Sequence, residues 1–250
     1  MALTAKPRLR RTVLSPAPPR QPMSHIDAHA RHMSMKIKPL CVVARMSGAV
    51  AAVAAFSPAL LIATPVAGAA PCPDVEVVFA RGTTEPPGVG GIGQAFVDSL
   101  RSQLGGRSVG VYAVNYPASN DFGSSTPAGG DDMSAHVQSM AANCPGTRLV
   151  LGGYSQGAAV VDLATTRMPA EVSDHVAAAA EFGAARSAFA DSLSAGPLPS
   201  VGALYTAKTI QMCVPNDPIC SQGGSDWRAH GAYVQTGMVN DAAAFAAGRV

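Results

Sequence analysis

The sequence predicts an α/β fold of three layers, in which helices cover both faces of a parallel sheet. Two observations point to this class. Short apolar runs typical of buried strands alternate with helix-like segments along residues 70–250, and strands that alternate with helices usually form a parallel sheet. Residues 153–157, Gly-Tyr-Ser-Gln-Gly, join one apolar run to one helix-like segment, as in a nucleophile elbow. About 180 residues fit one domain with a sizeable core.

Five apolar runs are expected to be strands. Each is six to eight residues long and is bounded by Gly, Pro or polar residues, which is typical of strands buried in a parallel sheet. Pro117 ends the second run, because proline cannot donate a hydrogen bond to a sheet. In chain order, the five runs are residues 75–80, 109–116, 147–152, 176–182 and 208–213.

Four segments are expected to be helices. The first places Phe96, Val97 and Leu100 on one face, and the second opens with two aspartates, which suit the start of a helix dipole. The polar stretch 118–130 is rich in Gly, Pro and Ser, so we expect a surface loop at the rim of the site. The four helices are expected over residues 94–104, 131–142, 158–165 and roughly 232–247.

Residues 1–69 differ in charge from the rest of the chain. They hold nine Lys and Arg against one Asp, a net charge of +8, whereas residues 70–250 hold nine against fifteen acidic residues, a net charge of −6. Residues 49–70 are apolar, follow three basic residues and contain Ala-Gly-Ala, which predicts a secretory signal peptide cleaved near Ala69 or Ala70. A membrane anchor is disfavoured because two prolines interrupt the run.

The first 34 residues are long and Arg/Pro-rich for a signal peptide. They are either an over-extended start or a disordered leader, and Met35 would make a more ordinary start. We expect the exported domain, residues 70–250, to be a monomer that is either free outside the cell or associated with the cell wall. Its acidic charge gives no indication of a nucleic-acid partner.

Four cysteines remain beyond the expected cleavage site. An even number in an exported chain implies two disulfides, with three pairings open. Cys213 and Cys220 are near neighbours in the sequence, and pairing them would leave Cys72 for Cys144. A zinc site is disfavoured because no C-x-x-C pair and no nearby pair of histidines occurs.

Ser155 is the candidate nucleophile. Gly153 and Gly157 flank it, and because they lack a Cβ the turn can tighten and lift the serine hydroxyl clear of the sheet. A chance match is the alternative, since small residues are abundant in this chain, but the strand before the motif and the helix after it disfavour chance. The motif therefore predicts a hydrolase.

A serine nucleophile needs a histidine base and a carboxylate that orients the base, and here both should follow the serine in the chain. His136 precedes Ser155 and lies within an expected helix, so we expect it at the surface. His175 satisfies the order but directly precedes a strand, away from the loops at the strand ends. His230, in a loop before the last helix, is the preferred base.

Asp217 is the preferred acid. It follows the carboxyl end of an expected strand, where the sites of α/β proteins assemble, and prolines and cysteines on both sides stiffen its loop. Asp226, four residues before His230, is the alternative acid, although a solvated residue or a helix cap is its preferred interpretation.

The oxyanion hole is expected to combine the backbone N–H of Gln156 with a donor from residues 81–85, Arg-Gly-Thr-Thr-Glu. Within that run, Thr83 offers both an N–H and a hydroxyl. The alternative is an ordinary turn between a strand and a helix. Such a turn would explain Gly82 but not the other residues of the Arg-Gly-Thr-Thr-Glu run.

Taken together, the motifs resemble those of the bacterial cutinase-like esterases. They are residues 80–85, residues 152–157, and Cys213-x3-Asp217-x2-Cys220 followed by His230. The resemblance spans residues 72 to about 247 and implies a lidless, five-stranded α/β-hydrolase without a cofactor or metal. For the site it implies a triad of Ser155, Asp217 and His230, oxyanion donors at Thr83 and Gln156, and disulfides Cys72–Cys144 and Cys213–Cys220.

We therefore expect a serine esterase that hydrolyses short- to medium-chain carboxylic esters, with lipids and cutin-like polyesters among the candidate substrates. Its activity should fall in mild acid as the histidine base takes up a proton. Trp227 departs from the family's pattern. It either lines the acyl groove, contacts a lipid surface, or is an ordinary half-buried tryptophan.

Two other functions are weighed against the esterase. Residues 88–93 match the G-x-G-x-x-G of dinucleotide-binding proteins, but the glycines begin eight residues after Ala80 and no acid ends the second strand, so no nucleotide partner is expected. A non-catalytic surface protein on the same fold is the second alternative, and the complete catalytic set disfavours it.

Overall fold

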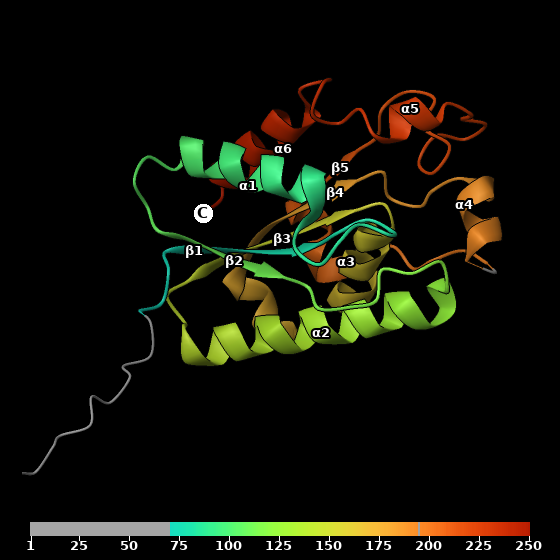
Figure 1. Ribbon diagram of the computed structural model, residues 1–250. Helices are drawn as coiled ribbons and strands as arrows, with labels where there is room; N and C mark the ends of the chain where they lie inside the picture. Colours follow the sequence, from blue (N-terminus) through green and yellow to red (C-terminus); the bar gives the residue numbers. More distant parts are fainter. Residues whose placement is uncertain (1–70, 195) are drawn as a thin grey trace, which may run out of the picture. The chain divides into compact units, whose positions relative to one another are not determined.

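Five strands pair in parallel into one sheet, with the order β2-β1-β3-β4-β5. The computed structural model describes residues 71–194 and 196–250 (Figure 1); the expected leader and signal peptide, residues 1–69, lie outside them. The strands are β1 (Val75–Ala80), β2 (Val109–Ala113), β3 (Arg148–Tyr154), β4 (Val176–Phe182) and β5 (Thr209–Met212). The predicted three-layer α/β class and the five-stranded parallel sheet are confirmed.

Two pairs of helices cover the sheet. Figure 1 shows α1 and α6 above the sheet and α2 and α3 below it. Successive side chains of a strand point to opposite faces, so Phe79 packs with Phe96 and Phe182 in the upper core, whereas Val78 belongs to the lower core beside α2 and α3. The bounds are α1 (Gly90–Gln103), α2 (Phe122–Asn143), α3 (Gln156–Arg167) and α6 (Met238–Ala247).

The helix α1 begins at Gly90, four residues before the expected start at residue 94. The carboxylate of Glu85 accepts a hydrogen bond from the N–H of Gly91 at 2.9 Å, and a negative charge at this end of a helix is favourable. The glycine-rich run that matches G-x-G-x-x-G is therefore a turn followed by the first turn of α1.

The prediction of a surface loop over residues 118–130 was wrong for most of its length, because α2 begins at Phe122. Gly129 and Gly130 lie against α3, where a Cβ on Gly129 would be 2.6 Å from the Val160 side chain. The close approach of two helices thus needs these glycines. Packing of the helix pair outweighs the low helix propensity that the sequence pattern indicated.

The last part of the chain holds more turns than expected. The helix predicted from residue 232 begins at Met238, because Gly237 adopts a left-handed conformation with φ of 78° directly before it. Four short helical elements were not predicted: α4 (Ala188–Leu193), α5 (Trp227–His230) and the 3₁₀ helices η1 (Ala170–His175) and η2 (Ala203–Lys208). The strand β2 ends at Ala113, three residues early.

Two disulfides are present, and both follow the favoured pairing. Cys72 joins Cys144, which links the segment before β1 to the end of α2, and Cys213 joins Cys220 in the loop after β5. In the described part of the chain, no helix combines the length and the hydropathy needed to cross a membrane.

The strand order places the candidate site. The chain leaves β1 toward β2 on one side and later enters β3 on the other side. Ligands of open α/β sheets bind at the carboxyl ends of the two strands where this reversal occurs. Thr83 follows β1 and Ser155 follows β3, so both lie at this switch point.

Candidate active site

Ser155 occupies a sharp turn between β3 and α3. Its φ of 54° and ψ of −117° are unusual for a residue with a side chain, and such conformations concentrate at functional sites. A Cβ on Gly153 would lie 2.1 Å from the Gly157 carbonyl oxygen, and a Cβ on Gly157 would lie 2.0 Å from the Ala80 carbonyl oxygen. Only glycine fits at either position, which gives the G-x-S-x-G spacing its physical reason.

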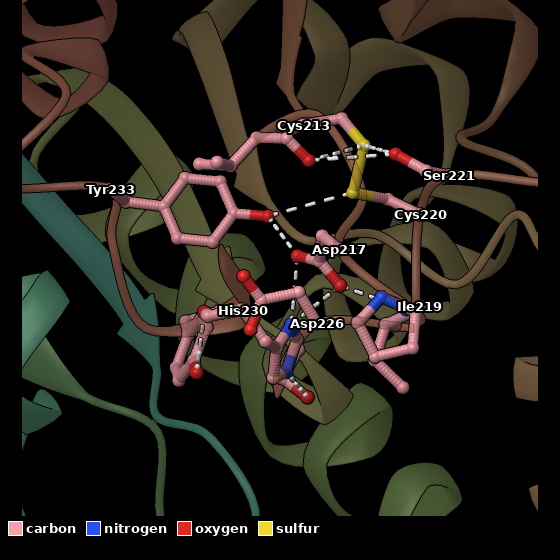
Figure 2. Close-up of polar contacts among 12 residues, drawn as sticks. Cys213, Asp217, Ile219, Cys220, Ser221, Asp226, His230 and Tyr233 are labelled. Carbon is pink, nitrogen blue, oxygen red and sulfur yellow. Dashed lines mark hydrogen bonds and ion pairs between the residues drawn. A yellow bond between two sulfur atoms is a disulfide. The ribbon is translucent and has the colours of Figure 1, made fainter. Parts of the chain in front are cut away.

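The structure brings Ser155, His230 and Asp217 together. His230 Nε2 is 2.9 Å from Ser155 Oγ. On the other side of the ring, His230 Nδ1 is 2.8 Å from Asp217 Oδ2 and 3.0 Å from Oδ1 (Figure 2). His230 ends α5 and Asp217 lies in the loop after β5. The arrangement can pass a proton from the serine hydroxyl to an imidazole held by a carboxylate.

The alternative residues lie in other settings. Asp226 caps α5 and accepts a hydrogen bond from the N–H of Arg228 at 2.9 Å. It is therefore a helix cap, one of the two roles expected for it. His175 ends η1. The expectation that His136 is a surface residue was wrong, because its half-buried ring stacks on Tyr112 and its Nε2 lies 2.9 Å from a carboxylate oxygen of Glu76.

Asp217 is completely buried and is held by three hydrogen-bond partners. Besides His230, the N–H of Ile219 donates to Oδ1 at 2.8 Å, and the hydroxyl of Tyr233 donates to Oδ2 at 2.5 Å (Figure 2). Burial by itself would raise the pKa of Asp217, but the hydrogen bonds from His230, Tyr233 and Ile219 outweigh it and lower the pKa below its ordinary value. The carboxylate therefore stays charged beside the imidazole.

The loop that carries Asp217 is tied down on two sides. The Cys213–Cys220 disulfide closes it, as Figure 2 shows. The segment after β4 also holds the loop through hydrogen bonds, because the N–H groups of Arg186 and Ser187 both donate to the carbonyl of Ile219, at 3.0 and 3.2 Å. These contacts fix the direction of the carboxylate relative to His230.

The two expected oxyanion donors both line the cavity at Ser155. Gln156 is the first residue of α3, so its N–H has no partner within the helix, while its side chain donates to the Ser119 carbonyl at 3.0 Å. Thr83 lies in the turn after β1. There, Glu85 accepts a hydrogen bond from the N–H of Gly82 at 2.6 Å, so the turn is ordered before any substrate binds.

The cavity has a volume of about 380 Å³, within the range of small-molecule sites. It is lined by Ser155 and extends to residues of α4 and α5. Trp227 lines it with 57% of its surface exposed, which excludes the half-buried interpretation. Thr83, Asn120, Phe189, Leu193, Ile219 and Trp227 are among its lining residues.

Several residues around the site were not anticipated. Tyr233, three positions after His230 in the chain, donates a hydrogen bond to Asp217. The hydroxyl of Tyr154 donates to the carbonyl of His230 at 2.9 Å. Glu85 orders the turn that holds Thr83. For Tyr154 and Glu85 the only signal was their place inside the two motifs. The α4 residues gave no signal, because six residues are too few for a clear helical period.

Known proteins resemble this chain over the residues that form the site. The family model described as Cutinase matches residues 71–250. Carboxylesterase Culp1 of Mycobacterium tuberculosis is 56% identical over 195 residues, which cover 76% of this chain and 89% of that protein. Phospholipase Culp4 of the same organism is 50% identical over 210 residues, covering 79% of this chain and 89% of that protein.

A solved structure agrees with the sequence relatives. The Trichoderma reesei cutinase in complex with a C11Y4 phosphonate inhibitor is 37% identical, with a TM-score of 0.55, over 70% of this chain and 76% of that one. A family model over the whole described range and relatives of 50% identity or more point to one family and one type of reaction. The chain belongs to the cutinase family and is a carboxylic ester hydrolase.

Proposed function

We propose that this chain is a secreted serine esterase that hydrolyses carboxylic esters through an acyl-enzyme on Ser155. One observation carries the proposal: His230 Nε2 lies 2.9 Å from Ser155 Oγ, while Nδ1 lies 2.8 Å from the buried carboxylate of Asp217. This is the hydrogen-bonded sequence that activates a serine for acyl transfer.

In the proposed cycle, Ser155 Oγ attacks the ester carbonyl carbon while His230 Nε2 takes the hydroxyl proton. The oxygen of the tetrahedral intermediate accepts hydrogen bonds from the N–H of Gln156 and from Thr83. His230 then gives its proton to the departing alcohol, which leaves the acyl group on Ser155. A water molecule, activated by the same histidine, releases the acid and regenerates the serine.

Secretion belongs to the same proposal. A basic segment, an apolar run and Ala-Gly-Ala precede the domain at residues 70–250, as in a signal peptide. The disulfides Cys72–Cys144 and Cys213–Cys220 fit an oxidising compartment outside the cell. We propose short- to medium-chain esters as substrates, and the similar protein named as a phospholipase makes phospholipids a further candidate.

A comparison of wild type with Ser155→Ala tests the function. We expect wild-type residues 70–250 to hydrolyse p-nitrophenyl esters and to be labelled by a fluorophosphonate probe at Ser155. The Ser155→Ala variant should lose roughly 10⁴-fold or more in kcat and all labelling. Ser139→Ala, at an exposed serine of α2, is the matched control and should keep both. Wild type that neither turns over an ester nor reacts with the probe would favour the non-catalytic surface protein.

A further inference from the structure

Arg186 takes no part in the proposed reaction, yet its side chain is held by two buried carboxylates. Its Nη2 lies 3.0 and 2.9 Å from the two carboxylate oxygens of Asp162 on α3, and 3.5 Å from an oxygen of Glu181 on β4. Both acids are completely buried, whereas the Arg186 side chain is 25% exposed. Its Nη1 also donates to the carbonyl of Ala185 at 2.9 Å. The guanidinium is therefore held by acceptors from three segments of the chain.

The main chain of Arg186 holds the loop of the candidate acid. Its N–H donates to the carbonyl of Ile219 at 3.0 Å, and the N–H of Ile219 donates to Asp217 Oδ1 at 2.8 Å (Figure 2). The carbonyl of Arg186 accepts from the side chain of Gln222 at 2.6 Å. One residue thus joins the buried carboxylates to the peptide that contacts Asp217.

The next residue, Ser187, strengthens this link. Its N–H also donates to the carbonyl of Ile219 at 3.2 Å, and its buried hydroxyl donates to the carbonyl of Pro218 at 2.6 Å. Both acceptors lie within two residues of Asp217. A displacement of residues 186–187 would therefore displace the segment that directly follows the acid.

Asp162 lies on the helix that begins beside the nucleophile. The helix α3 starts at Gln156, directly after Ser155, and Asp162 comes seven positions after the serine, which is about two helical turns. Because a helix keeps the spacing along its axis, the Asp162 carboxylate has a set position relative to the serine turn. The contact between Asp162 and Arg186 therefore connects the element that carries the nucleophile to the loop that carries the acid.

A buried ion pair suits this task better than it suits stabilisation. Taking two charges out of water is costly, so the net gain in stability is small, but any arrangement that separates the charges is strongly disfavoured. We infer that Arg186, held by Asp162, positions the Asp217 loop against the helix that carries Ser155. Arg186 is a positioning residue, because it acts through Asp217 and is not among the described residues that line the cavity. The inference rests on the proposed function.

The test removes one carboxylate of the cluster at a time. In Asp162→Asn the shape is kept and Glu181 still balances the guanidinium, but the charge that ties Arg186 to α3 is lost. We expect kcat for p-nitrophenyl butyrate at pH 7 to fall about fivefold with KM little changed, because the cavity is intact. Glu181→Gln is the matched control. It makes the same change at an equally buried residue and leaves the shorter contacts of Asp162 in place, so it should keep the wild-type kcat.

A second comparison shows whether the effect passes through Asp217. In Asp217→Asn the carboxylate that orients His230 is gone, so Arg186 has nothing left to position. We expect Asp162→Asn combined with Asp217→Asn to have the same kcat as Asp217→Asn alone. A general structural defect, or a displaced Ser155, would lower kcat by the same factor in both backgrounds.

Each kcat refers to folded protein, which the amplitude of thermal unfolding measures. Should Asp162→Asn not fold, Arg186→Lys takes its place, because it keeps the charges balanced. A lysine lacks the planar fork with which one nitrogen contacts Asp162 and the other contacts the Ala185 carbonyl. We expect its kcat to fall about threefold, and this fall to be absent in the Asp217→Asn background.

Three results would overturn the positioning role in an active enzyme. The first is a wild-type kcat in Asp162→Asn, or in Arg186→Lys where that variant takes its place. The second is an equal loss with and without Asp217→Asn, and the third is an equal loss in Glu181→Gln. Wild type without any ester turnover would instead overturn the proposed function, and the positioning role with it.

Discussion

At the scale of single residues, Tyr233 makes a contact with the candidate acid that the sequence motifs did not indicate. Its buried hydroxyl donates to Asp217 Oδ2, the same oxygen that lies 2.8 Å from His230 Nδ1. Burial and then the hydrogen bond to Asp217 raise the pKa of Tyr233 above its ordinary value, so the phenol remains a donor. We assign Tyr233 a positioning role, because it acts through Asp217 rather than on the substrate.

Replacing the phenol tests this role. In Tyr233→Phe we expect kcat to fall about tenfold, the equivalent of one hydrogen bond of about 1.4 kcal/mol, with KM little changed. Without this donor the pKa of Asp217 rises toward its ordinary value, so the carboxylate should take up its proton, and activity should be lost, at a higher pH than in wild type as the solution is acidified. Kinetics from pH 8 down to about pH 3 measure both effects.

Tyr205→Phe is the matched control for this change. Tyr205 is equally buried, but its hydroxyl has no hydrogen-bond partner among the described residues. We expect Tyr205→Phe to keep the wild-type kcat and pH profile. If both variants behave alike, Tyr233 acts only by filling space.

At the scale of elements, a buried cluster of charges joins α3, β4 and β5. Arg186 Nη2 lies 2.9 Å from Asp162 Oδ2 on α3 and 3.5 Å from Glu181 Oε2 on β4, and Gln211 on β5 donates to Glu181 at 2.7 Å. Both acids are completely buried and share one guanidinium. Burial, and the neighbouring Asp162, raise the pKa of Glu181 to about 8, while burial raises that of Asp162 to about 6.

These raised values predict that the free energy of unfolding falls as the pH rises from mildly acidic values to about 8. Between the ordinary glutamate pKa and about 8, the folded chain keeps a proton on Glu181 that the unfolded chain has released. The free energy of unfolding therefore falls as the pH rises through this range. Glu181→Gln cannot ionise, so its Tm should fall less between pH 5 and 9, ending roughly 3 °C or more above wild type at pH 9.

Thermal unfolding of both proteins at pH 5, 7 and 9 measures this difference. The outcome that contradicts it is an identical fall in Tm for wild type and Glu181→Gln, which would assign the pH dependence of stability to other groups in the molecule.

The same scale shows which elements could be predicted. The limits of β1 and β4 were predicted to the residue, because strands buried on both faces are continuous apolar runs. The helix starts were missed, since Glu85 extends α1 and the packing of Gly129 against α3 extends α2. Both contacts depend on how the chain folds back on itself, which the pattern of apolar and polar residues within each helix does not show.

At the scale of the whole molecule, the two disulfides have different tasks. Cys72–Cys144 spans 72 residues, and Cys213–Cys220 spans seven around the candidate acid. By the entropy of loop closure they stabilise the fold by up to about 4.4 and about 2.5 kcal/mol. The longer loop therefore matters more for stability, and the shorter one encloses Asp217.

Removing each disulfide separates the two tasks. We expect Cys72→Ser with Cys144→Ser to lower Tm by roughly 8 °C or more and to keep kcat/KM at 25 °C. Cys213→Ser with Cys220→Ser should lower Tm less but reduce kcat by about tenfold or more, because Asp217 loses its fixed direction. Equal losses of activity in the two pairs would argue against a positioning role for the shorter bridge.

The sequence by itself determined the α/β class, the order of the five strands along the chain, the serine turn and a short set of partners for it. These follow from local physics: apolar runs, glycines that permit a tight turn, and chain order. Only the tertiary structure decided that His230 and Asp217 reach Ser155, that Tyr233 holds the acid, and that α4 brings Phe189 to Trp227. Each of these depends on contacts between segments distant in the chain, and folding brings them together by burying the core beneath them.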